Sequence, residues 1–237
     1  MRPETPTIPS QCASPESSLS RLVIVLLLAL VALCAVAALD PATLQQQLIA
    51  RFGPARVVLL KDWLQMVYSA KAQGDETKLK RINDFINQNI VFEDDNSVWQ
   101  QSDYWATPLE TIGQGRGDCE DFSIIKYYSL RMAGIPVSKL RLVYVKATLA
   151  TAAGVRQQAH MVLAYYANPN AEPMVLDNLE PTIRPASKRP DLKPVFSFNS
   201  EGIFAGVSGK EKATTGGVGR LSRWEDALQR IRAEGFE

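Results

Sequence analysis

The chain has 237 residues, a formal net charge of +1 and 46% hydrophobic residues. This charge balance gives no electrostatic basis for nucleic-acid binding, and the apolar content is sufficient for a globular core. Of the three cysteines, only Cys119 follows the N-terminal hydrophobic segment, which excludes an intramolecular disulfide from the rest of the chain.

The N-terminal part of the chain predicts export. Residues 1–21 are rich in Pro and Ser and are expected to be disordered. An uninterrupted apolar run over 22–39 follows, and it ends in small residues that suit a signal peptidase. Because the run is also just long enough to span a bilayer, a cleaved signal peptide and a retained N-terminal membrane anchor both stay open. Either places the following domain outside the cytoplasm, since Arg2 and Arg21 mark the inner end.

The first elements after this segment are predicted to be helices. One is expected over 41–51 and a second over 54–73, which begins with a proline and ends before Gly74. A third helix is expected to follow, with Asp75 as its cap. Its apolar positions recur at helical spacing and form one face: Leu79, Ile82, Phe85, Ile86 and Ile90.

A glycine-rich loop over 113–117 precedes the most informative helix. Asp118 occupies the N-cap position of this helix, so Cys119 falls in the first turn. The helix dipole and the free backbone N–H groups there favour a thiolate, and the same N–H groups can donate to an oxyanion.

The remainder of the chain predicts an antiparallel sheet, a linker and a final helix. Short strands are expected over 139–149, 158–166, 173–178, 194–198 and 202–204. The Gly-, Thr- and Ser-rich stretch 205–221 is typical of a flexible linker, and 222–237 carries an amphipathic helix. Leading helices followed by an antiparallel sheet indicate an α+β domain, which we place at 40–204.

Three residues are the candidate catalytic group. Cys119 is the nucleophile, and His160, the only histidine in the chain, is on a predicted strand as its base. Asp177 ends the next strand and would orient the imidazole, which is a papain-like arrangement of parts. The alternative for each is ordinary: a lone Cys is often a small buried hydrophobe and a lone His a core residue.

Carboxylates surround the candidate nucleophile. Asp118, Glu120 and Asp121 place three of them within one turn, and Asp103 is a candidate fourth. Oxygen ligands of this kind suit calcium, although the alternative is helix capping and a favourable helix dipole. The indole N–H of Trp105 is a candidate oxyanion donor, with packing in the core as its alternative.

Four motifs in order give a family resemblance. They are DYWATP at 103–108, GDCEDF at 117–122, QAHMVL at 158–163 and LDNL at 176–179. With them the chain resembles the bacterial transglutaminase-like cysteine proteinases of the LapG type over about 48–204. The resemblance implies a transglutaminase-like fold in which Cys119, His160 and Asp177 form the triad.

The same resemblance implies a biological role. It implies a periplasmic protease that cleaves the N-terminal region of a large surface adhesin next to paired alanines and so releases cells from a biofilm. It also implies calcium beside the nucleophile and inhibition by an inner-membrane receptor of the LapD type, which senses cyclic di-GMP. Two alternatives stay open. One is a transglutaminase-type acyltransferase, because the same triad can pass its thioester to an amine instead of to water. The other is a non-catalytic binding module on the same scaffold.

Overall fold

The computed structural model describes residues 39–151, 154–204, 206–208 and 221–236. Leu39–Glu237 form one compact unit. The predicted segment 1–21, nearly all of the apolar run 22–39 and most of the predicted linker lie outside the described residues. Within the described part, none of the helices combines the length and the hydrophobicity needed to cross a bilayer.

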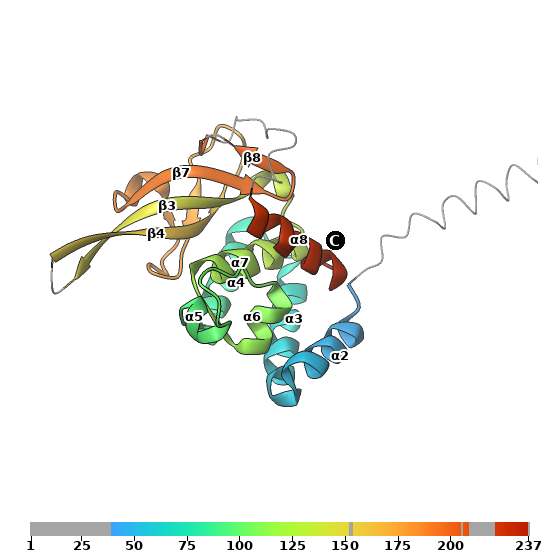
Figure 1. Ribbon diagram of the computed structural model, residues 1–237. Helices are drawn as coiled ribbons and strands as arrows, with labels where there is room; N and C mark the ends of the chain where they lie inside the picture. The colour runs from blue at the N-terminus through green and yellow to red at the C-terminus, as the bar shows by residue number, and fades with distance from the viewer. Residues whose placement is uncertain (1–38, 152–153, 205, 209–220, 237) are drawn as a thin grey trace, which may run out of the picture. The chain divides into compact units, whose positions relative to one another are not determined.

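Three helices come first, as predicted, and belong to the helical half of the unit, which lies below the sheet in the view of Figure 1. They are α2 (Pro41–Phe52), α3 (Val57–Ala70) and α4 (Asp75–Asn89). The predicted helix over 54–73 differs from the structure, because Pro54–Arg56 form a separate 3₁₀ turn before α3 begins. Asp75 is not the cap of α4 but its first residue. Its carboxylate instead accepts hydrogen bonds from Lys139 Nζ and the Tyr165 hydroxyl, which tie α4 to the sheet.

A central group of elements carries the nucleophile. The helix α6 (Pro108–Gln114) begins with a capping box between Thr107 and Glu110. It leads through β2 (Arg116–Gly117) into α7 (Cys119–Met132), which is almost entirely buried. The short α5 (Asp95–Val98) contacts β2, and β1 (Val91–Phe92) pairs with β2 in parallel.

The second half of the unit is a six-stranded sheet in the order β6-β5-β4-β3-β7-β8, and every pair in it is antiparallel. The strands are β3 (Leu140–Thr151), β4 (Gly154–Tyr165), β5 (Met174–Leu176), β6 (Arg184–Pro185), β7 (Leu192–Asn199) and β8 (Gly202–Phe204). The long β3–β4 ribbon extends beyond the helices (Figure 1). The predicted strands and the α+β class are therefore confirmed, although β4 and β7 are longer than expected, β5 is shorter, and β6 was not predicted.

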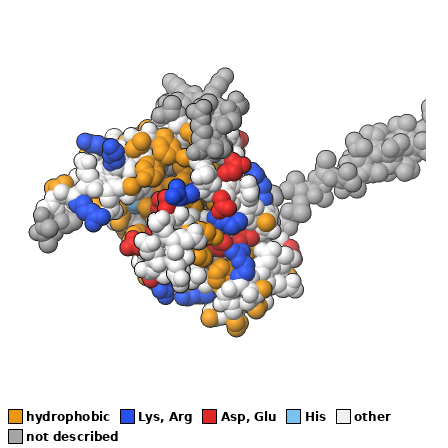
Figure 2. All heavy atoms as spheres, viewed as in Figure 1, with side chains coloured by type: hydrophobic (Ala, Val, Ile, Leu, Met, Phe, Trp, Pro, Cys, Tyr) orange, Lys and Arg blue, Asp and Glu red, His pale blue; other side chains and the backbone are white. Residues whose placement is uncertain are grey.

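One sheet face packs on the helices to make the main core. Leu142, Met161, Leu163 and Phe198 from the strands belong to the same cluster as the buried face of α7. A smaller apolar cluster forms on the other sheet face around Val143, Val145, Val162, Ala164, Tyr166 and Val175. Figure 2 shows hydrophobic side chains gathered over the sheet half of the visible face.

The helix α8 (Ser222–Ala233) belongs to the same compact unit as the preceding helices and the sheet. Trp224 is fully buried, and its ring packs against Trp105, Tyr127 and Phe198. Arg230 forms an ion pair with Glu110 of α6 and donates to the Trp105 carbonyl at 2.8 Å. The C-terminal helix is therefore part of the core and packs against the segment that contains Trp105.

Candidate active site

The backbone around Cys119 depends on two glycines. Gly115 ends α6 in the left-handed region with φ of 66°, a conformation that L side chains rarely adopt. A Cβ atom at Gly117 would lie 2.4 Å from an oxygen of Asp121, so no side chain fits there. Asp118 then caps α7 by accepting from the Glu120 amide at 3.2 Å, which makes Cys119 the first residue of the helix.

His160 and Asp177 form a buried pair beside this helix. Nε2 of His160 lies 2.8 Å from Oδ1 of Asp177, and both residues are only 2% exposed. With Nε2 engaged, Nδ1 is the ring nitrogen left to accept a proton. Cys119 and His160 line one cavity of about 330 Å³ together with Glu120, Gln158 and Leu179. The structure thus brings the three predicted catalytic residues to one place from α7, β4 and the end of β5.

Arg189, which the sequence analysis did not single out, is a third member of this buried group. Its Nη2 lies 2.7 Å from Oδ2 of Asp177, and the Leu179 amide donates to Oδ1 at 3.1 Å. Burial opposes ionisation of Asp177, but hydrogen bonds and charge from His160 and Arg189 outweigh it and lower the pKa of Asp177 to about 2. Asp177 is therefore ionised throughout the physiological pH range.

The main chain of Asp177 is held from the helical side. Lys126 Nζ and Asn87 Nδ2 each donate to its carbonyl oxygen at 2.9 Å. Lys126 is 1% exposed, and this burial lowers its pKa to about 7 against the opposing effect of Asp177. Lys126 lies on the buried face of α7, two turns after Cys119. A lysine at an otherwise apolar helix position was the sequence signal that could have identified it.

Negative charge dominates the surroundings of the thiol. Sγ of Cys119 donates to Oε2 of Glu120 at 2.7 Å. Burial and the charges of Glu120 and Asp118 raise the pKa of Cys119 well above its usual range, while the backbone amide of Met161 hydrogen-bonds the sulfur and lowers it. Formation of a thiolate therefore requires compensation of the adjacent carboxylates.

The carboxylates form a cluster that fits a cation. Ligand atoms of Asp95, Asp118 and Asp121 lie within 4.8 Å of one another, and those of Asp118, Cys119 and Glu120 do likewise. Asp95 was not predicted, although the acidic run 93–95 was its sequence signal. The predicted ligand Asp103 is in neither group. Its carboxylate accepts from the Trp105 indole at 3.0 Å and pairs with Arg223 at 2.9 Å. The indole N–H of Trp105 is thereby committed to Asp103.

Two observations test whether this cluster suits a metal ion. One carboxylate oxygen of Asp95 and one of Asp121 are buried without a hydrogen-bond partner. Burial and the neighbouring carboxylates raise the pKa of Asp118 to about 10, raise that of Asp95 to about 6, and raise that of Asp121 strongly. Unpartnered oxygens and crowded negative charge are what a hard divalent cation would satisfy, and an all-oxygen donor set suits calcium.

Comparisons with known proteins agree with this geometry. A sequence model of the bacterial transglutaminase-like cysteine proteinases matches residues 64–191. The chain belongs to this family of cysteine proteases. No curated protein sequence matches the chain significantly.

Solved structures of one relative extend the match to the whole fold. Legionella pneumophila LapG is 35% identical, with a TM-score of 0.65 over 81% of this chain and 97% of that one. The EGTA-treated form of LapG gives 36% identity and a TM-score of 0.67 over the same shares. The calcium-bound form gives 35% and 0.65, over 81% of this chain and 99% of that one. The family resemblance and the transglutaminase-like fold expected from the sequence are confirmed.

Proposed function

We propose that this protein is a calcium-dependent cysteine endopeptidase in which Cys119, His160 and Asp177 form the triad. The observation that carries the proposal is the buried His160–Asp177 pair in the same cavity as a cysteine at a helix N-terminus. A buried, ionised Asp177 fixes the tautomer of His160 and stabilises its protonated form. Membership of a cysteine protease family supports peptide hydrolysis over acyl transfer to an amine.

The residues suggest the following sequence of steps. Nδ1 of His160 takes the thiol proton, and Sγ attacks the scissile carbonyl carbon, so that the oxygen becomes negatively charged beside the N–H groups that begin α7. His160 then gives the proton to the leaving amine as the C–N bond breaks, which leaves a thioester on Cys119. Water, deprotonated by His160, hydrolyses the thioester and regenerates the thiol.

Asp95, Asp118, Glu120 and Asp121 would hold the calcium ion in this scheme. When bound, calcium would offset the negative charge that raises the pKa of Cys119 and would fix the turn that positions it. The acidic cluster and the calcium-bound structure of a relative in the same family support this assignment.

We further propose the biological role that the family resemblance implies. The substrate is a large cell-surface adhesin, cleaved in its N-terminal region next to paired alanines in the periplasm, so that cells leave a biofilm. The apolar segment over 22–39 supports export. A LapD-like inner-membrane receptor that senses cyclic di-GMP is the proposed inhibitor, and it would act by covering the active-site face.

Incubation of the purified protein with an N-terminal fragment of the adhesin from the same genome tests the activity. Cleavage that stops on chelation and in Cys119→Ala supports the proposal. Crosslinking to an amine would indicate acyl transfer instead, and binding without reaction would indicate a non-catalytic module. For the receptor, the isolated LapD-like periplasmic domain should bind the protease and prevent cleavage; binding that leaves cleavage undiminished would contradict the inhibitory role.

A further inference from the structure

One edge of β4 is open beside the active site. The strand pairs with β3 along its whole length, from Gly154 opposite Thr151 to Tyr165 opposite Leu140. On its other side it pairs with β5 only over Leu163, Ala164 and Tyr165. In the described part of the chain, the rest of that edge has no partner strand.

The hydrogen-bond alternation shows which residues face the open edge. The Tyr166 amide donates to the Lys139 carbonyl at 2.8 Å, on the β3 side. Because successive residues of an antiparallel strand point their polar backbone groups to opposite sides, the even-numbered residues of β4 bond to β3. The odd-numbered residues Val155, Gln157 and Ala159 therefore direct their N–H and C=O groups to the open edge, and all three are exposed.

The nucleophile lies on the same edge. Met161 is the next odd-numbered residue, and its amide hydrogen-bonds the Cys119 sulfur while its carbonyl accepts from Ser123 Oγ at 3.1 Å. The start of α7 thus occupies the edge between the end of β5 and the open positions. A strand placed beside Ala159 and Gln157 would continue the line of β5 and end at the thiol.

We propose that the substrate binds as an extended strand along this open edge, pairing its backbone with Val155, Gln157 and Ala159 and presenting its scissile carbonyl to Cys119. This inference rests on the proposed endopeptidase activity and specifies how the substrate is held. The open length is about 14 Å, enough for about five extended residues. Main-chain pairing of this kind supplies affinity and leaves specificity to the side chains.

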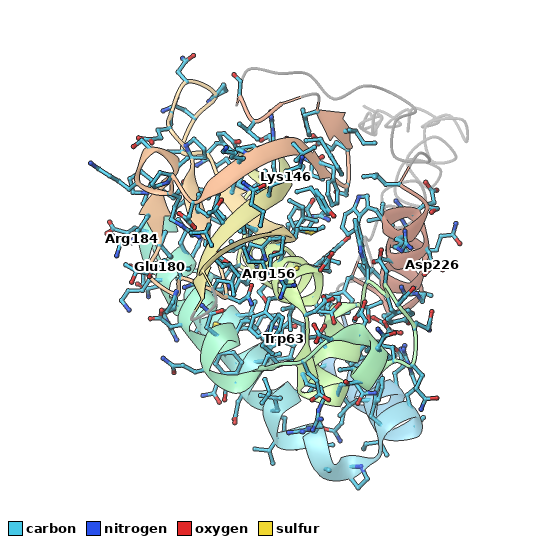
Figure 3. All side chains as sticks on the ribbon, turned by 60° about the vertical axis from the view of Figure 1, so that its left-hand side comes forward. Trp63, Lys146, Arg156, Glu180, Arg184 and Asp226 are labelled. Carbon is cyan, nitrogen blue, oxygen red and sulfur yellow. The ribbon has the colours of Figure 1, made fainter. Side chains whose placement is uncertain are left out.

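The flanks of this edge are suited to a peptide. Phe92 and Leu179 line the catalytic cavity although they are 50% and 41% exposed, so they offer apolar contacts to substrate side chains. Arg156 and Gln158 line it from β4. Figure 3 shows Arg156 on this stretch, with Glu180 and Arg184 beyond it on the β5–β6 side. Because the proposed pairing uses the substrate main chain, the site selects unfolded or extended segments without proline at the pairing positions.

The first test uses the wild-type enzyme and synthetic peptides spanning the paired-alanine region of the adhesin, each with one amide N-methylated. N-methylation removes a donor, so cleavage should fall at every second position and persist at the positions between, which serve as matched controls. A loss of about tenfold or more in kcat/KM at the sensitive positions is expected. Sensitivity without a period of two would overturn the inference.

The second test changes the protein. Gln157→Pro removes one edge N–H, and this sheet already accommodates Pro194 in β7. Its kcat/KM should be at least about fivefold below that of Gln157→Ala, which keeps the amide. The thermal midpoint and the rate of Cys119 alkylation by iodoacetamide should match the wild type, because neither depends on substrate pairing. Equal kcat/KM in the two variants would contradict the inference.

These outcomes separate the inference from the function on which it rests. If the wild type cleaves the parent peptide but neither test shows the pairing, only the substrate-binding inference fails. If the wild type leaves every peptide intact while iodoacetamide still alkylates Cys119, the endopeptidase proposal fails and the inference fails with it. If Gln157→Pro does not fold, the N-methyl series decides alone.

Discussion

Arg189 binds the oxygen of Asp177 that His160 does not use. Nη2 of Arg189 lies 2.7 Å from Oδ2, and Nε2 of His160 lies 2.8 Å from Oδ1. Asp191 holds the guanidinium in turn, with its Oδ2 at 2.7 Å from Nη2. The orientation of the imidazole therefore depends on a series of contacts from His160 through Asp177 and Arg189 to Asp191.

Arg189→Gln should weaken catalysis without removing a catalytic group. The loss of a charged hydrogen bond should lower kcat/KM by about tenfold to a hundredfold. The pKa of Asp177 is depressed to about 2, so its stabilising contribution is complete above its unfolded value and is lost as the pH falls towards 2. Without Arg189 that pKa rises, and both the acid limb of the kcat/KM profile and acid unfolding should move to higher pH. Arg184→Gln, an exposed arginine on β6, is the matched control and should move neither.

The triad itself is tested by Cys119→Ala and His160→Ala, each of which should abolish cleavage. Asp177→Asn should retain somewhat more activity but still lose several orders of magnitude, because the amide no longer selects the tautomer of His160. Cleavage assays on proteins with unchanged circular dichroism provide the measurement. Substantial cleavage by the Cys119→Ala protein would remove the assignment.

The acidic cluster predicts opposite effects of one substitution with and without calcium. In chelator, Asp95→Asn should raise or preserve the thermal midpoint, because it removes one of several crowded buried charges. With calcium, the same variant should gain less stability than the wild type, since a ligand is weakened. Differential scanning calorimetry measures both midpoints, and Asp62→Asn on the exposed side of α3 controls for net charge.

Metal selectivity is a separate prediction. Chelation should inactivate the enzyme, and calcium should restore it better than magnesium, because magnesium demands a tighter octahedron and sheds water reluctantly. Glu120→Ala should weaken calcium uptake in titration calorimetry. If the wild-type protein takes up no calcium, the metal assignment is lost.

Because Lys126 is buried, its contribution to the free energy of unfolding should depend on pH. Burial lowers its pKa to about 7, so the unfolded chain binds more protons between that value and the ordinary lysine pKa. Its contribution to the free energy of unfolding should therefore rise as the pH increases from about 7 to 10. Comparison of wild type with Lys126→Met by urea unfolding should show a difference that changes by about 1–4 kcal/mol over this range. A constant difference would show that Lys126 is not held in this way.

The C-terminal helix should be required for stability. Trp224→Ala removes a fully buried indole from contacts with Trp105, Tyr127 and Phe198 and should cost about 3–5 kcal/mol. Gln229→Ala, on the exposed side of α8, should have little effect. Denaturant unfolding of the two variants gives the comparison, and equal midpoints would show that α8 is dispensable for the core.

The sequence by itself determined the local elements and the residue types that can react. Apolar spacing and capping residues specify α7 and its start at Cys119, because these depend on near neighbours along the chain. A single histidine and a single cysteine after the apolar segment were enough to single out the proposed catalytic pair from the sequence. The division of 54–73 into a 3₁₀ turn and α3 was missed, because element boundaries depend on packing as well as on propensity.

Only the tertiary structure decided which distant groups meet. Asp95 joins the carboxylates of α7, and Arg189 reaches Asp177, through contacts between segments that no local pattern connects. The same holds for the open edge of β4, which exists because β5 stops at Leu176 and α7 occupies the next position. Such contacts arise when the whole core closes, since their gain must outweigh the entropy of joining remote parts of the chain.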